Sequence, residues 1–262
     1  MSRWNPDDYR EHSSQQQKWA REILARLDLK GHERILDIGC GDGRITAEVA
    51  RCVPQGIVVG LDSSAEMVAF AQRDFASEHL PNLRFQQGTA QSLDFHEQFD
   101  WVISFACLHW VIDHRPALLG IRRALRPHGR VMLQFGGKGN AAQMADVVGE
   151  VIARPQWAGY FAGFTFPWAF YSPDEYRPWL DEAGLVAARL ELVPKDMTHE
   201  GAAGLAGWLR TTWMPYWQRL PAELQEPFLD EIIEGYLATH PLDSNGLVHL
   251  SMVRLEIEAT RK

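Results

Sequence analysis

The sequence is poor in cysteine. It has three, Cys40, Cys52 and Cys107, among 262 residues. An odd number without a metal-type spacing gives neither a disulfide framework nor a zinc-binding pattern. Because free cysteines are among the most buried residue types, we expect reduced thiols in the core and no metal site.

An excess of positive charge and a long hydrophobic run are also missing. Lysine and arginine total 26 against 34 aspartate and glutamate, and the resulting net charge of −8 disfavours a nucleic-acid partner. No stretch approaches the roughly 18 apolar residues of a membrane span, and the start MSRWNPDDYR lacks the pattern of a signal peptide. We therefore expect a soluble cytoplasmic protein that binds neither nucleic acid nor membrane.

The sequence does contain an alternation of short β-branched runs and longer segments with helical spacing, which is typical of βαβ units in an α/β fold. The expected strands are 34–38, 57–61, 83–87, 101–105, 130–135, 186–193 and 247–259. The expected crossover helices are 44–52, 65–78 and 115–125, the last closed by Pro127 and Gly129. This pattern predicts a parallel sheet, with about seven strands in all.

Two segments break the alternation and are rich in aromatic residues. Residues 140–171 hold eight aromatic side chains interrupted by glycine and proline. Residues 197–245 have helical spacing and carry three tryptophans. We expect both to be insertions that form a cap, with most of the rings engaged in packing.

The most specific local pattern is RILDIGCGDG at residues 34–43, an apolar strand followed by three glycines and then a helix. Such a turn lets a ligand approach backbone amides at the helix N-terminus. A dinucleotide fingerprint would need glycine at position 44, which is Arg44, and Asp37 would repel its pyrophosphate. The turn therefore favours a cationic ligand such as S-adenosylmethionine over NAD; a tight turn without a ligand is the alternative.

Asp62 ends the second strand about 20 residues after the glycines, where a carboxylate can accept hydrogen bonds from ribose hydroxyls. An acidic residue at this point is also a common helix N-cap, as are Ser63 and Ser64 beside it. Sequence alone leaves both roles open.

A series of motifs in order along the chain resembles the class I S-adenosylmethionine-dependent methyltransferases. The matching segments are DIGCGDG, Asp62, GTAQSL at 88–93, FDWVISFACLHW at 99–110 and LRPHGRVML at 125–133. The resemblance covers roughly residues 34–135. It implies an enzyme with S-adenosylmethionine as cofactor and a doubly wound, mostly parallel seven-stranded Rossmann-like sheet, whose last strand runs antiparallel between strands five and six.

The same resemblance implies which residues bind the cofactor. Many members have aspartate where this chain has Thr89, so the residues after it are expected to supply more of the adenine recognition. The implied set places Asp37, Gly39 and Gly41 at the methionine end, Asp62 at the ribose, and Ser63 and Met67 at the adenine face, and it adds Tyr9, Cys40, Thr89, Ala90, Gln91 and Phe105.

WNPDDY at 4–9, YREHSSQQ at 9–16 and CLHW at 107–110 are similar to the trans-aconitate and juvenile hormone acid carboxyl methyltransferases. In those enzymes an N-terminal segment folds over the cofactor, and a glutamine from it joins a tryptophan at the substrate carboxylate. The matching residues are Gln16 and Trp110. The expected organisation is an N-terminal lid at 1–33, a cofactor-binding core at 34–139, a cap insertion at 140–171, core again at 172–196, a helical cap at 197–246 and a final core strand at 247–262.

The chemistry of the acceptor distinguishes two reactions. A carboxylate is ionised near pH 7 and needs no general base, only alignment with the methyl donor. An amine or phenol arrives protonated and favours a nearby base, for which His109 is the candidate. We expect methyl ester formation on a small organic acid, with Gln16, His109 and Trp110 at the reacting end. An N-, C- or phenolic O-methyltransferase, or one for a carrier-bound acyl group, is the alternative.

Specificity is expected to come from the cap. A second acidic group on the acceptor would require a cation facing it, and Lys138 and Arg210 are the candidates. An apolar acid is equally compatible with so many aromatic rings. The expected partner is a small-molecule substrate, and the protein is expected to be a monomer or a homodimer.

Overall fold

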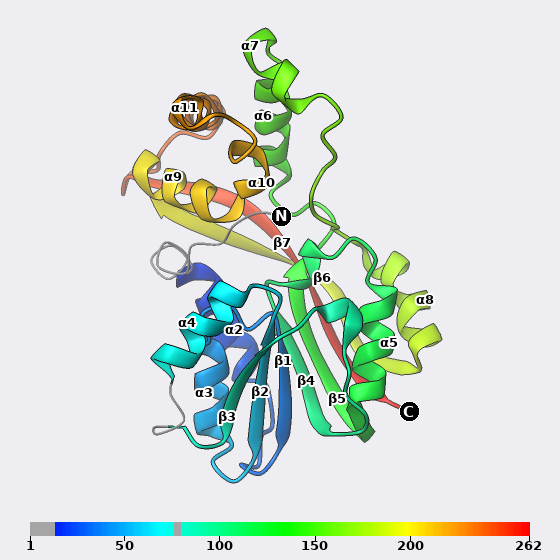
Figure 1. Ribbon diagram of the computed structural model, residues 1–262. Coiled ribbons are helices and arrows are strands. Elements are labelled where there is room, and N and C mark those ends of the chain that lie inside the picture. Colours follow the sequence, from blue (N-terminus) through cyan, green and yellow to red (C-terminus); the bar gives the residue numbers. More distant parts are fainter. Residues whose placement is uncertain (1–13, 76–79) are drawn as a thin grey trace. The chain divides into compact units, whose positions relative to one another are not determined.

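The computed structural model describes residues 14–75 and 80–262, except for the side chains of residues 14–16 (Figure 1). Tyr9 and the side chain of Gln16 lie outside this described part. The chain divides into two compact units. We call Gln16–Lys138, Trp168–Val193 and Arg254–Lys262 the sheet unit, and Gly139–Pro167 with Pro194–Val253 the helical unit.

Within the described residues, seven strands form one sheet in the order β3-β2-β1-β4-β5-β7-β6. The pairs among β1 to β5 are parallel, whereas β7 runs antiparallel to β5. The mostly parallel sheet and the position of the antiparallel strand are thus confirmed. The strands are β1 Arg34–Ile38, β2 Ile57–Asp62, β3 Leu83–Gln87, β4 Phe99–Phe105, β5 Leu125–Gly136, β6 Leu185–Glu200 and β7 Leu247–Arg261.

Helices of the sheet unit cover both faces of the sheet (Figure 1). Alternate side chains of a strand point to opposite faces. Ile35 of β1 therefore packs in a hydrophobic cluster with α2, α3 and α4, whereas Leu36 packs in a second cluster with α5 and α8. These helices are α2 Ser14–Leu24, α3 Arg44–Cys52, α4 Ala65–Asp74, α5 Arg115–Ala124 and α8 Pro173–Ala183.

The segment after α5 differs from the expectation of a helix closed by proline and glycine before a short strand. β5 begins directly at the end of α5. Leu125 pairs with Phe99 and Arg130 with Trp101, so the residues between the two pairs bulge out of the ladder. His128 in this bulge has a φ of 62°. The proline beside it cannot donate a ladder hydrogen bond, which explains its place in a bulge.

α4 and β6 show the other large differences from the predicted bounds. α4 ends at Asp74 instead of residue 78, and Phe75 caps it with a non-helical backbone. β6 continues to Glu200, so the first residues of the segment expected to be helical belong to a strand, and α9 starts at Gly201. Seven strands and the crossover helices nevertheless occur where the periodicity predicts them.

The helical unit is held together by its aromatic residues. Phe161 stacks on Phe228 with ring centres 5.4 Å apart, and Trp157 packs edge-on against Phe228 at 5.2 Å. The Trp157 indole also donates a hydrogen bond to Glu231 at 3.0 Å. No helix in the described part of the chain combines the length and hydrophobicity that crossing a bilayer requires. The helices of this unit are α6 Ala142–Ile152, α7 Pro155–Ala158, α9 Gly201–Thr212, α10 Met214–Trp217 and α11 Ala222–Thr239.

Candidate functional site

The glycine turn follows β1 at the carboxyl end of the parallel strands, where open α/β sheets bind their ligands. Gly39, Gly41 and Gly43 have φ values of 79°, 54° and 81°, a region that other residues rarely adopt. A Cβ atom on Gly39 would lie 2.2 Å from the Sγ atom of Cys107, which follows β4. Position 39 therefore requires glycine for two reasons, its positive φ and the close approach of Cys107.

Backbone hydrogen bonds attach this turn to the end of β2. The N–H groups of Gly39 and Cys40 both donate to the carbonyl of Leu61, at 2.7 and 3.1 Å. The N–H of Gly41 donates to the Asp62 carboxylate at 2.9 Å. The glycine turn and Asp62 are separate motifs in the sequence, and these hydrogen bonds join them in the structure.

The structure separates the two roles that the sequence left open for Asp62. Its second carboxylate oxygen accepts from the N–H of Ser64 at 2.9 Å, while the Ser64 hydroxyl accepts from the N–H of Met67 and caps α4. Ser64 is the N-cap residue. Asp62 instead accepts a hydrogen bond from the glycine turn.

A second carboxylate, that of Asp37, lies buried at the end of β1 and is 2% exposed. The Thr46 hydroxyl donates to it at 2.7 Å. Burial raises the pKa of Asp37 to about 7, the hydrogen bond from Thr46 opposes this rise, and the charge of Asp62 adds to it. Burial also raises the pKa of Asp62. Two buried carboxylates whose ionised forms repel each other favour a cationic ligand, because a positive group relieves both the repulsion and the cost of burial.

The two thiols at the turn are free cysteines. Burial raises the pKa of Cys40, and it raises the pKa of Cys107, with the charges of Asp37 and Asp62 adding to both effects. Both side chains therefore stay protonated and act as small hydrophobic groups.

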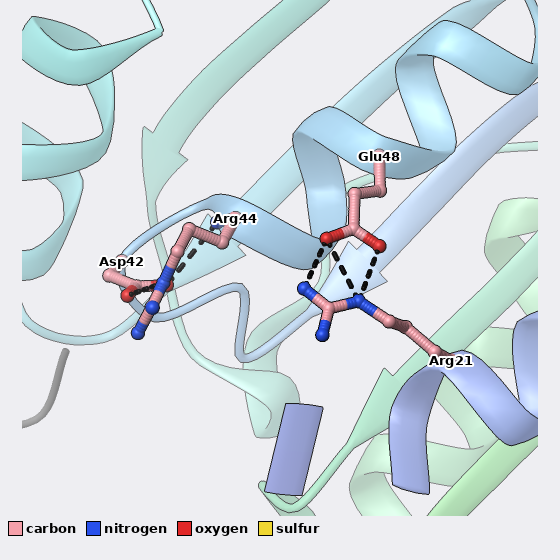
Figure 2. Close-up of polar contacts among 4 residues, drawn as sticks. All are labelled: Arg21, Asp42, Arg44 and Glu48. Atoms are coloured by element: carbon pink, nitrogen blue, oxygen red, sulfur yellow. Dashed lines mark hydrogen bonds and ion pairs between the residues drawn. The ribbon is translucent and has the colours of Figure 1, made fainter. Parts of the chain in front are cut away.

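The start of α3 is fixed by polar contacts (Figure 2). The Arg44 guanidinium donates to Asp42 at 2.6 Å, and the Arg44 N–H donates to the same carboxylate at 3.2 Å. Arg44 stands where a dinucleotide fingerprint requires glycine. Its contacts with Asp42 thus stabilise the turn. Arg21 of α2 binds Glu48 of α3 through Nε and Nη2, which attaches α2 to the same helix.

The residues expected at the adenine lie just after β2, just after β3 and in the first turn of α4. Asp62 pairs with Gln87 in the ladder, and the Gln87 amide donates to the carbonyl of Ser63 at 3.1 Å. The Thr89 hydroxyl hydrogen-bonds with Ser92 at 2.7 Å, across the short 3-10 helix Ala90–Ser92. Met67 is buried, Ala90 belongs to a hydrophobic core cluster, and Gln91 is exposed. Their contacts with a base stay predictions.

The expected reacting end is the short 3-10 helix Leu108–Trp110, which follows Phe105 at the end of β4. The Trp110 ring packs edge-on against Trp168 at 5.5 Å, and the His109 ring lies 6.1 Å from Phe170. The carbonyl of His109 accepts from the N–H of Ala169 at 2.9 Å. The segment from Trp168 onward thus packs against His109 and Trp110 within the sheet unit.

His109 has a defined hydrogen-bonding state. The N–H of Gly136 donates to its Nδ1 atom at 3.4 Å, which assigns the ring hydrogen to Nε2. Burial holds the pKa of His109 well below its usual value, and the positive charge of Arg254 and the neighbouring His114 act in the same direction. The lowered pKa favours the neutral imidazole, whose Nε2–H is then the available donor.

The two cations expected at the substrate lie in different units. Lys138 is exposed in the sheet unit, where its backbone N–H donates to the carbonyl of Tyr171 at 3.0 Å. Arg210 lies on α9 in the helical unit and forms an ion pair with Glu226 of α11. Both assignments stay predictions.

Sequence reasoning missed Gly136 and Arg254 as neighbours of His109. Arg254 is 4% exposed and lies on β7, opposite Gly136. One signal was available, because Arg254 falls on the strand face otherwise occupied by Val248, Leu250 and Met252. An arginine on an apolar face points to a specific partner.

Comparisons with known proteins agree with this geometry. Residues 35–129 match a family model described as a methyltransferase domain. The chain is 32% identical over 262 residues to a trans-aconitate 2-methyltransferase of Deinococcus radiodurans, covering 98% of both chains, and 31% identical to that of Variovorax paradoxus, covering 100% of both. Among solved structures, the YcgJ protein of Bacillus subtilis aligns with a TM-score of 0.66 at 19% identity, covering 94% of this chain and 99% of that one. At that identity the likeness concerns the fold.

Proposed function

This chain belongs to the class I S-adenosylmethionine-dependent methyltransferases, and from that premise we propose that it methylates a carboxylate of a small organic acid, forming a methyl ester. Relatives that match over the whole length and carry the name trans-aconitate 2-methyltransferase support this choice of acceptor. Trans-aconitate is therefore the first acid to test.

The glycine turn fits the cofactor. S-adenosylmethionine supplies an electrophilic methyl group on a sulfonium centre and also carries an ammonium group. In this proposal the Asp37 carboxylate offers negative charge to the methionine end of the ligand, and the Asp62 carboxylate accepts hydrogen bonds from its ribose. The left-handed backbone of Gly39 and Gly41 keeps the turn free of side chains that would block close approach.

The hydrogen-bonding geometry of His109 is the observation that carries the proposal. Its Nδ1 atom accepts from the Gly136 N–H, and its pKa lies well below neutrality, so the residue is an Nε2–H donor and a poor base. An amine or phenol would require proton removal, whereas a carboxylate is already ionised. A donor that orients an anionic oxygen suits a carboxylate.

Trp110 is the second proposed donor to that carboxylate. Its ring is fixed edge-on against Trp168, so the direction of the indole is set before a substrate binds. Gln16 on α2 is the third, proposed from the resemblance, and its side chain lies outside the described part. Hydrogen bonds from neutral donors hold one oxygen in place without removing the negative charge that attacks the methyl group.

The proposal is tested with a panel of acceptors and methyl-labelled S-adenosylmethionine, followed by mass spectrometry of the products. The panel contains trans-aconitate, other di- and monocarboxylic acids, and matched amines and phenols. We expect label in a methyl ester of a carboxylic acid. Label transferred to amines or phenols alone contradicts the proposal.

A further inference from the structure

The chain changes direction at Ala106, the first residue after β4. Its φ of 53° lies in the left-handed region, which is unfavourable for a residue with a Cβ atom. The ladder pairs Phe105 with Gln134 of β5, and the backbone N–H of Ala106 then donates to the carbonyl of Gln134 at 2.8 Å. A strained residue is thus held in place where the strand ends.

Residues on both sides of Ala106 contact the glycine turn or the strand end before it. Ser104 is fully buried, and its hydroxyl donates to the carbonyl of Ile38 at 2.7 Å, directly before the turn. Cys107 lies on the other side, and its Sγ atom takes the space that a Cβ atom on Gly39 would need. Ala106 therefore lies where β4 meets the turn at which we propose that the cofactor binds.

The segment that follows Ala106 carries the proposed donors to the acceptor. The N–H of Trp110 donates to the carbonyl of Cys107 at 3.0 Å, which closes the short 3-10 helix. The N–H of Gly136 donates to His109 at 3.4 Å. Because the helix begins two residues after Ala106, the backbone angles of Ala106 set the direction in which both donors leave the sheet.

Glycine would adopt the conformation of Ala106 without strain, as it does at three positions of the turn. The left-handed region is small for a residue with a Cβ atom and broad for glycine. Alanine at position 106 therefore allows fewer backbone conformations than glycine would, although it lowers the stability of the fold. Backbone strain of this kind persists where the surrounding structure enforces it, and it clusters at functional sites.

We propose that Ala106 is a positioning residue for methyl transfer. Its restricted backbone fixes the direction of the helix that carries His109 and Trp110, so that an acceptor bound by them is aligned with the methyl group of a cofactor at the glycine turn. Such alignment accounts for a large part of the rate when two bound reactants meet, and a displacement of about 1 Å lowers that rate strongly. This inference rests on the proposed function, because it assigns both donors to the acceptor.

The test is Ala106→Gly, which relieves the strain and widens the range of backbone angles. We expect the melting temperature to rise by about 2 to 4 °C. The kcat, measured with the best carboxylic acid of the acceptor panel, trans-aconitate first, should fall by about ten- to a hundredfold. His128→Gly is the matched control, because His128 has a φ of 62° in the exposed bulge near the start of β5. It should also gain stability, and its kcat should stay at the wild-type value.

Two further measurements separate positioning from a purely structural role. Ala106→Ser keeps the Cβ atom, so its kcat should stay within about threefold of the wild type. Hydrogen exchange of the backbone N–H groups of Trp110 and Val111 should be about tenfold faster in Ala106→Gly and unchanged in His128→Gly. Both N–H groups donate within this segment, to Cys107 and Leu108.

Wild-type kcat or unchanged exchange in Ala106→Gly overturns the inference and leaves ester formation intact. An equal loss of kcat in Ala106→Ser also overturns it, as does a loss in Ala106→Gly that only follows weaker binding of S-adenosylhomocysteine in calorimetry. Absence of a methyl ester from every carboxylic acid overturns the proposed function itself, and the exchange measurement then still decides whether Ala106 fixes the segment.

Discussion

The Asp62 carboxylate accepts a hydrogen bond from the backbone N–H of Gly41, a residue 21 positions earlier in the chain. This contact joins the end of β2 to the middle of the glycine turn. Because Ser64 caps the following helix, Asp62 is not needed for that purpose. The Asp62 carboxylate is thereby held in place at the turn where we propose that the cofactor binds.

Asp62→Asn should weaken S-adenosylmethionine binding by about 1.5 to 3 kcal/mol, the usual worth of a hydrogen bond to a charged group. Ser64→Ala is the matched control, because it removes the cap and should cost about 1 kcal/mol of folding stability with little change in affinity. Calorimetry measures the affinity and urea denaturation measures the stability. Equal affinities in wild type and Asp62→Asn would assign Asp62 a purely structural role.

Gly39→Ala should destabilise the protein by at least about 2 kcal/mol, since it adds a steric overlap to an unfavourable positive φ. The new Cβ atom would lie 2.2 Å from the Cys107 Sγ atom and 2.3 Å from its Cβ atom. Cys107→Gly in the same chain should recover part of the loss.

Gly149→Ala on α6 is the contrasting control for Gly39→Ala. A Cβ atom on Gly149 meets nothing within 4 Å, so the substitution should raise stability by about 0.5 to 1 kcal/mol. Thermal and urea unfolding give both values. A Gly39→Ala protein as stable as Gly149→Ala would contradict the packing described for the turn.

Asp37 should make stability depend on pH. Its folded pKa is raised to about 7 from an ordinary value of 3.8, so the folded state keeps a proton that the unfolded state has released. Its contribution is fully present below about pH 4 and is lost as pH rises to about 7. Asp37→Asn retains an acceptor for Thr46 and should remove this decline, which is on the order of a few kcal/mol. Urea unfolding between pH 4 and 8 measures the difference.

The same residue should couple cofactor binding to pH. A cation beside Asp37 favours its ionised form, so S-adenosylmethionine binding should release a proton and strengthen between about pH 6 and 8. Asp37→Asn should bind more weakly and without that dependence. A wild-type affinity that is constant over this range, in calorimetry corrected for buffer ionisation, would contradict the raised pKa.

His109→Asn should have a small effect if no proton is removed from the acceptor. Asparagine can accept from the Gly136 N–H and still donate, so kcat at saturating substrates should fall by less than about tenfold and stay constant from about pH 5.5 to 8. Loss of a general base would instead cost a hundredfold or more. Steady-state rates of both proteins across this pH range measure the effect. A wild-type kcat that rises steeply with pH, together with an inactive variant, would identify His109 as a base.

The sequence pattern predicts correctly those elements whose bounds depend on neighbouring residues in the chain. β1, β3 and α3 have the bounds that periodicity predicts, and the three glycines of the turn all have positive φ. The bulge at His128 was harder to foresee, because a helix that ends beside a proline and a strand that begins there share the same turn signals. Strand ends likewise depend on pairing with neighbours.

The tautomer and the pKa of His109 depend on contacts between segments that are distant in the sequence. The tautomer of His109 is set by Gly136, 27 residues away, and its low pKa also depends on Arg254 of the last strand. The sequence marks Arg254 as a charge on an apolar strand face but does not identify its neighbours. A motif predicts which residues meet the cofactor, whereas the antiparallel insertion of β7 decides which cation lies near His109.

The central claim is that the methyl group is transferred to a carboxylate oxygen. The direct test is the stability of the labelled product in mild alkali, after incubation of the protein with labelled S-adenosylmethionine and trans-aconitate. A methyl ester hydrolyses and releases the label as methanol, and this is the expected result. Label that stays attached to the product after alkali treatment would show transfer to carbon and would contradict the proposal.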